Sequence, residues 1–172
     1  PTPSPSLGEQ QALDAVYGLA QGCYAVQSPQ NGKYMRRFKK AAALVDDGLS
    51  YNFTANNIGE AAHFYFKPTS FSHYMLTDKD GRYLATHLPN EVSAGRYAGR
   101  FAEFKVTAHS GNNGEIHFSF YGPALKKVLQ HNYGNIGAYR HGGLYVIDAL
   151  NPANLNNETA FRLVPQSDCR PF

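Results

Sequence analysis

Histidine is the residue type here with the widest chemistry, since its imidazole can bind metals or move protons near neutral pH. The sequence contains seven, at positions 63, 73, 87, 109, 117, 131 and 141. None forms an HExxH motif or pairs with a cysteine at zinc-site spacing. We therefore predict no metal site and no cofactor, and we interpret His63 and His117 as hydrogen-bonded strand residues.

A second possible metal site, Asp78-Lys-Asp80-Gly81, has the opening of a calcium-binding loop. Such a loop needs a bidentate Glu at its twelfth position. The twelfth residue here is Pro89. Because Asp and Gly also favour turn backbones, the sequence predicts a hairpin turn at this point.

Nucleophilic and acid–base chemistry has no recognisable residue set in this chain. The G-x-S-x-G motif is missing, and no Asp or Glu pair stands out among only 13 acidic residues. We therefore predict that this segment is not an enzyme. A small enzyme on a β-barrel, with His and Asp supplied by loops, remains a weaker alternative.

Two segments are candidates for ligand binding. Tyr139, Arg140 and His141 stand in a glycine-rich basic stretch that could face a sugar or an acidic group, or could simply be a flexible hairpin. In the basic run 36–40, strand alternation places Arg37 and Lys39 on one face. That face is either a solvated edge or a contact for an anionic partner such as a polysaccharide, a lipid head group or a neighbouring domain.

The elements that would position these residues repeat three times. One apolar alternation recurs at 62–66, 102–106 and 159–163. Before each copy, a strand, a short turn and a second strand occur, with anchors at 24 and 34, 74 and 83, and 118 and 128. Because internal repeats decide architecture, the sequence predicts three β-units around a pseudo-three-fold axis, which is a β-trefoil.

Composition agrees with an all-β fold. Twelve Tyr and eleven Phe, with no Trp, supply the large apolar side chains, and 16 Gly with 10 Pro indicate many turns. A net charge of +3 is too small to suggest a nucleic-acid partner. No apolar run is long enough to span a membrane.

The predicted organisation has three parts. Residues 1–7 are Pro/Ser-rich and are interpreted as a linker remnant. Apolar residues at helical spacing predict a short helix within 8–20, and residues 21–172 form a single trefoil domain. Its units begin near Cys23, Ser70 and Glu115, and the first is expected to include a middle strand at 41–45.

The two cysteines, Cys23 and Cys169, lie at the two ends of this domain. In a closed barrel the first and last strands are neighbours, so we predict a disulfide, although two unrelated buried thiols are the alternative. A disulfide implies an oxidising compartment. We therefore expect a secreted or periplasmic protein, either free or tethered as a lipoprotein.

Two longer segments carry a resemblance to a known family. Residues 62–85 resemble a stretch in the amino-terminal region of large bacterial secreted or lipoprotein hydrolases of the amidohydrolase or renal-dipeptidase type. Residues 161–172 are similar to the junction with the catalytic domain of those enzymes. The resemblance implies an accessory domain followed by a metal-dependent hydrolase, whose metal ligands would lie beyond Phe172.

Two functions therefore stay open. The first is a non-catalytic accessory domain of an exported bacterial hydrolase, which docks to the catalytic domain or presents substrate through Tyr-lined clefts between units. The second is a free-standing, lectin-like carbohydrate-binding module. The Gln-x-Trp motif of ricin-type trefoils cannot occur here because the chain has no Trp, but Tyr can still stack on a sugar.

Overall fold

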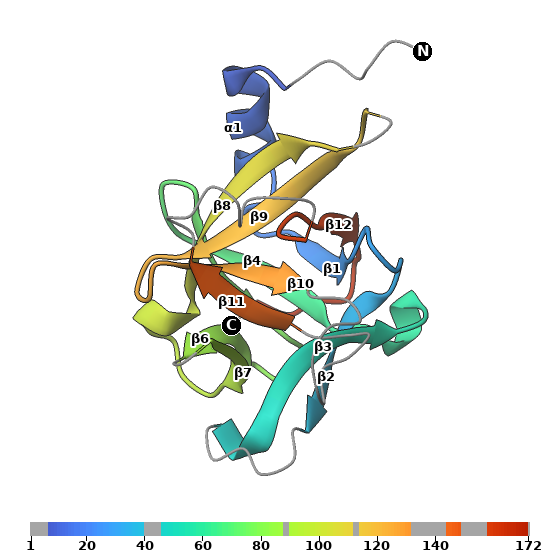
Figure 1. Cartoon of the computed structure of the whole chain (residues 1–172), viewed down its shortest axis with the longest axis vertical. Coiled ribbons are helices and arrows are strands. Elements are labelled where there is room, and N and C mark those ends of the chain that lie inside the picture. The colour runs from blue at the N-terminus through green and yellow to red at the C-terminus, as the bar shows by residue number, and fades with distance from the viewer. Residues whose placement is uncertain are drawn as a thin grey trace.

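Twelve strands form a sheet that closes on itself in the described parts of the chain (Figure 1). The structure is a computed structural model that describes residues 7–39, 46–87, 90–111, 114–131, 144–148 and 158–171. Every strand pairing in these residues is antiparallel, and the strands fall into three successive groups of four. The predicted all-β class is confirmed.

The strand bounds follow the predicted units closely. The first unit contains β1 (Cys23–Gln27), β2 (Tyr34–Lys39), β3 (Leu49–Ala55) and β4 (His63–Ser70). The second contains β5 (His73–Thr77), β6 (Tyr83–His87), β7 (Glu91–Gly95) and β8 (Glu103–Ser110). The third contains β9 (Ile116–Gly122), β10 (Lys127–His131), β11 (Leu144–Asp148) and β12 (Arg162–Pro165).

Six of these strands make the barrel wall, in the order β1, β4, β5, β8, β9 and β12. The wall closes because β12 pairs with β1, while Phe118 and Phe161 exchange two backbone hydrogen bonds of 2.8 Å. The other six strands pair as three hairpins, β2–β3, β6–β7 and β10–β11. A closed wall leaves no sheet edge along the barrel.

The repeated apolar positions are buried together in one core cluster. Equivalent residues of the three units are each no more than 1% exposed: Val26, Leu76 and Phe120; Met35, Leu84 and Leu129; and Phe64, Phe104 and Phe161. The Phe120 ring lies 6.2–6.3 Å from the rings of Phe66, Phe104 and Phe161, which come from all three units. Burying each such side chain stabilises the fold by about 1.5–3 kcal/mol, so the repeat is the core itself.

The helix α1 (Glu9–Tyr17) lies at the end of the barrel away from the β2–β3 and β6–β7 hairpins (Figure 1). Val16 is buried in the core, and the Tyr74 hydroxyl donates a 2.5 Å hydrogen bond to its carbonyl. The helix ends earlier than the predicted span 8–20. The chain turns at Gln21, which has a φ of 61°, so that the Gln21 N–H reaches the carbonyl of Phe66 at 2.8 Å.

The predicted hairpin turn at residues 78–81 is present, with the Gly81 N–H donating to the Asp78 carbonyl at 3.0 Å. Gly32 and Gly81 adopt φ values of +71° and +78°, which glycine reaches without steric cost. Asp46–Gly48 forms a 3₁₀ turn, η1, directly before β3. The expected middle strand at 41–45 lies outside the described residues. Nor do the described segments contain a helix long and apolar enough to cross a membrane.

Candidate ligand-binding groove

An open groove of about 310 Å³ lies between the first unit and the turn that joins β5 to β6 in the second unit. One side is made by Arg36 and Arg37 on β2 and by residues 78–80 of that turn. The other side is made by residues 59–63, which run from the 3₁₀ turn η2 (Ile58–Glu60) into β4, and by Asp168 and Cys169. The trefoil therefore gathers four segments that are far apart in the sequence.

Two carboxylates fix the Arg37 side of the groove. The Arg37 guanidinium donates to Asp78 Oδ2 at 3.0 Å and to Asp80 Oδ2 at 2.6 Å. Asp80 is half exposed, whereas only 4% of Asp78 is exposed. Since a charge-assisted hydrogen bond is stronger than a neutral one, Arg37 ties the β5–β6 turn of the second unit to β2 of the first.

The buried carboxylate of Asp78 is fully supplied with donors. Its Oδ2 also accepts from the Tyr51 hydroxyl at 2.9 Å, and its Oδ1 accepts from the backbone N–H groups of Asp80 and Arg82. Burial, followed by the neighbouring Asp78 charge, raises the pKa of Tyr51 well above its ordinary value. Tyr51 therefore keeps its proton and donates a hydrogen bond to Asp78, which helps to hold this wall in one geometry.

The opposite wall is held by His63. Its Nδ1 lies 2.6 Å from Asp168 Oδ1, and its Nε2 lies 2.9 Å from the carbonyl oxygen of Ile58. The hydrogen bond from His63 lowers the pKa of the Asp168 carboxyl. The imidazole thus joins β4 both to the η2 turn and to the C-terminal segment. The prediction that His63 is a hydrogen-bonded strand residue is confirmed.

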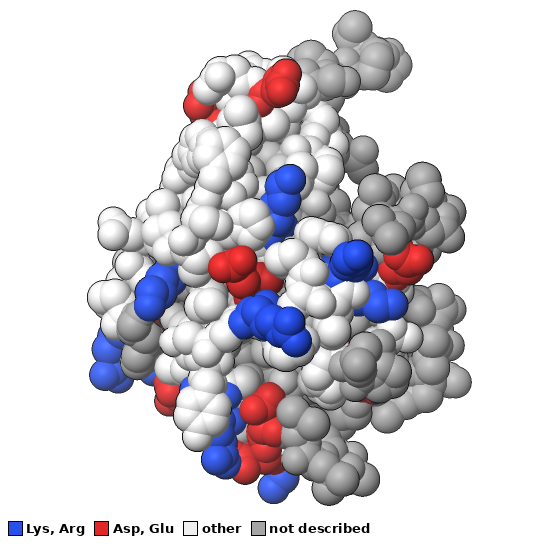
Figure 2. Space-filling model, turned by 90° about the vertical axis from the view of Figure 1, so that its left-hand side faces the viewer, with Lys and Arg blue, Asp and Glu red and all other residues white. Residues whose placement is uncertain are grey.

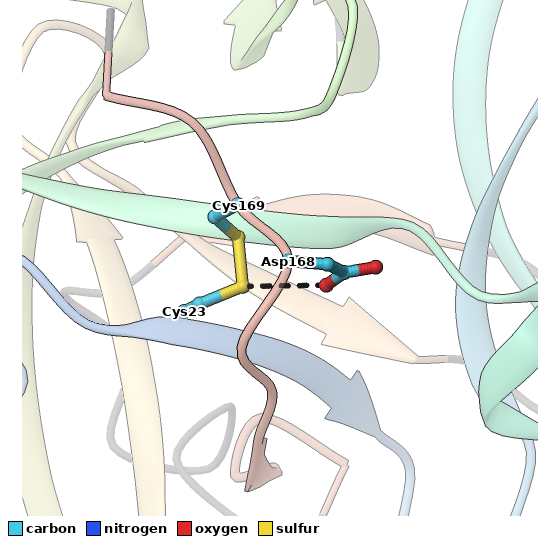
Figure 3. Close-up of side chains that lie close together, drawn as sticks. All are labelled: Cys23, Asp168 and Cys169. Atoms are coloured by element: carbon cyan, nitrogen blue, oxygen red, sulfur yellow. Dashed lines mark hydrogen bonds between the residues drawn. A yellow bond between two sulfur atoms is a disulfide. The ribbon is translucent and has the colours of Figure 1, made fainter.

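The predicted disulfide is present at the rim of the groove. Cys23 and Cys169 are bonded, with their Cα atoms 5.6 Å apart. Figure 3 shows Asp168 beside them, with its Oδ1 3.8 Å from Cys23 Sγ. Among the described residues these three form the one group close enough to suggest a metal site. A cysteine binds a metal through its thiolate, which a disulfide does not offer, so this group is left with a single carboxylate as a ligand and is unsuited to hold a metal.

The predicted binding residues differ in their positions relative to the groove. Arg37 lines the groove, but two carboxylates already occupy its guanidinium. Lys39 is exposed at the far end of β2 and does not line the groove. Arg36, which alternation placed on the other face from Arg37, is exposed and does line it. The segment Tyr139, Arg140 and His141 lies outside the described residues.

The groove can make both polar and apolar contacts. Arg36, Lys79, Glu60 and Asp80 offer donors and acceptors, and Ala61, Ala62 and the disulfide offer small apolar surfaces. Charges of both signs are present, so the lining does not select a strongly charged polymer. Basic and acidic side chains are likewise interspersed over the face in Figure 2.

Comparison with solved structures identifies the architecture. The designed 3-fold symmetric protein ThreeFoil matches 83% of this chain and 98% of its own length, with a TM-score of 0.58 and 13% identity. The chain has the β-trefoil fold. A salivary protein of the Cysteine and Tryptophan-Rich family from Culex quiquefasciatus matches this trefoil over 84% of the chain and 93% of its own, with a TM-score of 0.60 and 13% identity.

A third match is part of a larger enzyme. The GlcNAcα1-4Gal releasing endo-β-galactosidase from Clostridium perfringens aligns with 85% of this trefoil at a TM-score of 0.57 and 14% identity, but only 33% of that enzyme is covered. At such identities the matches establish the fold. No family model matches the chain, and no curated protein matches it by sequence.

Proposed function

We propose that this trefoil is a non-catalytic binding module that takes a carbohydrate in the groove between its first unit and the β5–β6 turn. The observation that carries the proposal is the lining, in which hydrogen-bonding side chains alternate with small apolar surfaces around about 310 Å³. A sugar offers the same combination, because its hydroxyl groups donate and accept hydrogen bonds and its C–H faces are apolar. Small-molecule sites generally have this size and a few convergent polar groups.

Rigidity of the walls supports the same proposal. Arg37 fixes one wall through Asp78 and Asp80, and the disulfide anchors the other. Preorganised walls reduce the ordering that a ligand must impose on binding. Tyr-lined clefts were expected from the sequence, but none of the described residues that line this groove is Tyr or Phe. We therefore expect recognition by hydrogen bonds, with a Kd of roughly 0.1–1 mM for a small sugar.

Calorimetry with a panel of neutral mono- and oligosaccharides tests the proposal. Arg36→Ala and Lys39→Ala form a matched pair, since both residues are exposed on β2 and only Arg36 lines the groove. We expect Arg36→Ala to weaken binding at least about tenfold through the loss of a hydrogen bond to a charged donor, and Lys39→Ala to leave it unchanged. No binding by any sugar, or equal loss in both variants, would contradict the proposal.

The second candidate is an accessory domain of an exported bacterial hydrolase, followed by the catalytic domain. It is supported by the likeness of residues 62–85 and 161–172 to such enzymes, and by the alignment of this trefoil with a third of a galactosidase chain. The disulfide suits a secreted or periplasmic site. Analytical ultracentrifugation with a separately produced hydrolase domain from the same polypeptide tests this candidate: a complex supports docking, and two independent species contradict it.

A further inference from the structure

His63 lies between two groups that can only accept hydrogen bonds. Asp168 Oδ1 is 2.6 Å from its Nδ1, and the carbonyl oxygen of Ile58 is 2.9 Å from its Nε2. A neutral imidazole carries one N–H and therefore donates once, whereas an imidazolium carries two. Both hydrogen bonds form together only when the His63 ring holds two protons and Asp168 is ionised.

These two acceptors belong to separate segments of the chain, the η2 turn and the C-terminal segment, which both contribute to one side of the groove. Ile58 begins the η2 turn, and its carbonyl also accepts from the Ala61 N–H at 3.2 Å. Asp168 lies between two fixed points of the C-terminal segment: the Gln166 N–H, which donates to the Cys23 carbonyl at 2.7 Å, and the Cys169 disulfide. His63 is therefore the side chain that spans from η2 to this segment.

We propose that His63 is a proton-controlled latch that joins the η2 turn to the C-terminal segment and so sets the shape of the groove. With two protons the ring holds both segments. With one proton it keeps a single partner, because its unprotonated nitrogen then faces an oxygen lone pair. The latch is therefore closed when the ring carries two protons and released when it carries one.

Among the charged groups around the groove, Asp168 is the one that pairs with the His63 ring. Glu60 of η2 uses its Oε2 to accept from the Asn56 N–H, and Asp80 of the β5–β6 turn is paired with Arg37 of β2. Arg36 and Lys79 also line the groove, and both are exposed. Across the sheet, β1 places uncharged Ala25 opposite His63, and Cys23 is held in the disulfide. The ion pair with Asp168 is the contact that titration of His63 breaks.

Nitrogen-15 NMR of the histidine rings tests the latch directly, without any ligand. We expect His63 in the intact chain to show two protonated ring nitrogens in mild acid, and we expect the second proton to be held less firmly in the Asp168→Asn variant, which removes the carboxylate charge. The half-buried ring of His73, whose Nδ1 contacts the Phe71 carbonyl, serves as the internal control and should not change between the two proteins. A single-proton ring at His63 throughout the range from about pH 5 to 8, or no difference in Asp168→Asn, would overturn the proposal.

Hydrogen exchange gives a second readout that a purely structural role would not move. After correction for the intrinsic pH dependence, the Ala61 and Gln166 amides should exchange about fivefold faster once His63 loses its second proton. In His63→Gln the same amides should show no such step. A step that persists in His63→Gln would show that another group controls these segments. Because neither experiment uses a sugar, failure of carbohydrate binding and failure of the latch are separate outcomes.

Discussion

Removal of the Cys23–Cys169 disulfide should lower the stability of this trefoil by a predictable amount. The two residues are separated by 146 positions and join β1 to the segment that follows β12, where the barrel closes. For a closed loop of this length, the chain-entropy relation gives about 17 cal/mol/K, or about 5 kcal/mol at 25 °C. In a domain of this size each kcal/mol shifts Tm by about 2–4 °C, so the expected fall is roughly 10–20 °C.

Differential scanning calorimetry of the Cys23→Ala/Cys169→Ala double variant measures this change. The folded state should survive, because the β1–β12 pairing and the buried core do not depend on the sulfur bond. Reductant should lower the Tm of the unmodified chain by a similar amount and leave the double variant unaffected. A Tm that falls by less than about 3 °C would correspond to about 1 kcal/mol, and it would refute the argument that this bond restrains the unfolded chain.

Three further predictions follow from the core and the first wall of the groove. Phe64→Ala and Phe104→Ala should each reduce the free energy of unfolding by about 3–5 kcal/mol in urea titrations, since both rings are fully buried at equivalent positions; a cost below about 1 kcal/mol for either would contradict their equivalence. Burial lowers the pKa of His131 to about 4, below the value of about 6.5 expected in the unfolded chain, so acidification protonates the unfolded state first. Stability should therefore fall by on the order of 3 kcal/mol between about pH 6.5 and 4, and a His131→Gln variant that kept this slope would exclude the residue as its source. Arg37→Met should destabilise by about 1–3 kcal/mol because it leaves a buried carboxylate without its cation, whereas Lys39→Met on the same strand should stay within about 0.5 kcal/mol.

The fold was predictable from the sequence because the apolar pattern that specifies each unit is local and occurs three times. Equivalent apolar residues such as Met35, Leu84 and Leu129 recur at nearly constant spacing and occupy one layer of the core. Period-two alternation identifies a half-buried strand, and the presence of three copies of the four-strand unit identifies the barrel. The disulfide followed from closure of that barrel. The division into a linker remnant 1–7, a helix within 8–20 and a domain 21–172 remains a prediction, and Leu7 already packs partly against the core.

The groove could not be predicted in the same way, because its walls come from segments that no local pattern links. Asp78 and Asp80 were correctly interpreted as turn residues, but a turn motif does not reveal that their carboxylates hold Arg37. Asp168 stands beside Cys169, and that adjacency was the available signal: once Cys23 and Cys169 are paired, Asp168 must lie near β1 and its neighbour β4. The exposed basic run suggested a free cation at Arg37, whereas the fold provides two carboxylates for it.

Carbohydrate binding in the groove between the first unit and the β5–β6 turn can be mapped residue by residue. The decisive experiment is amide chemical-shift mapping during titration with the best-binding sugar of the panel. The expected shifts fall on residues 36–37, 59–63, 78–80 and 168–169, the segments that line the groove. Shifts confined to another surface, such as the exposed ring pair Tyr17 and Phe71, whose ring centroids are 5.3 Å apart, would contradict binding in this groove.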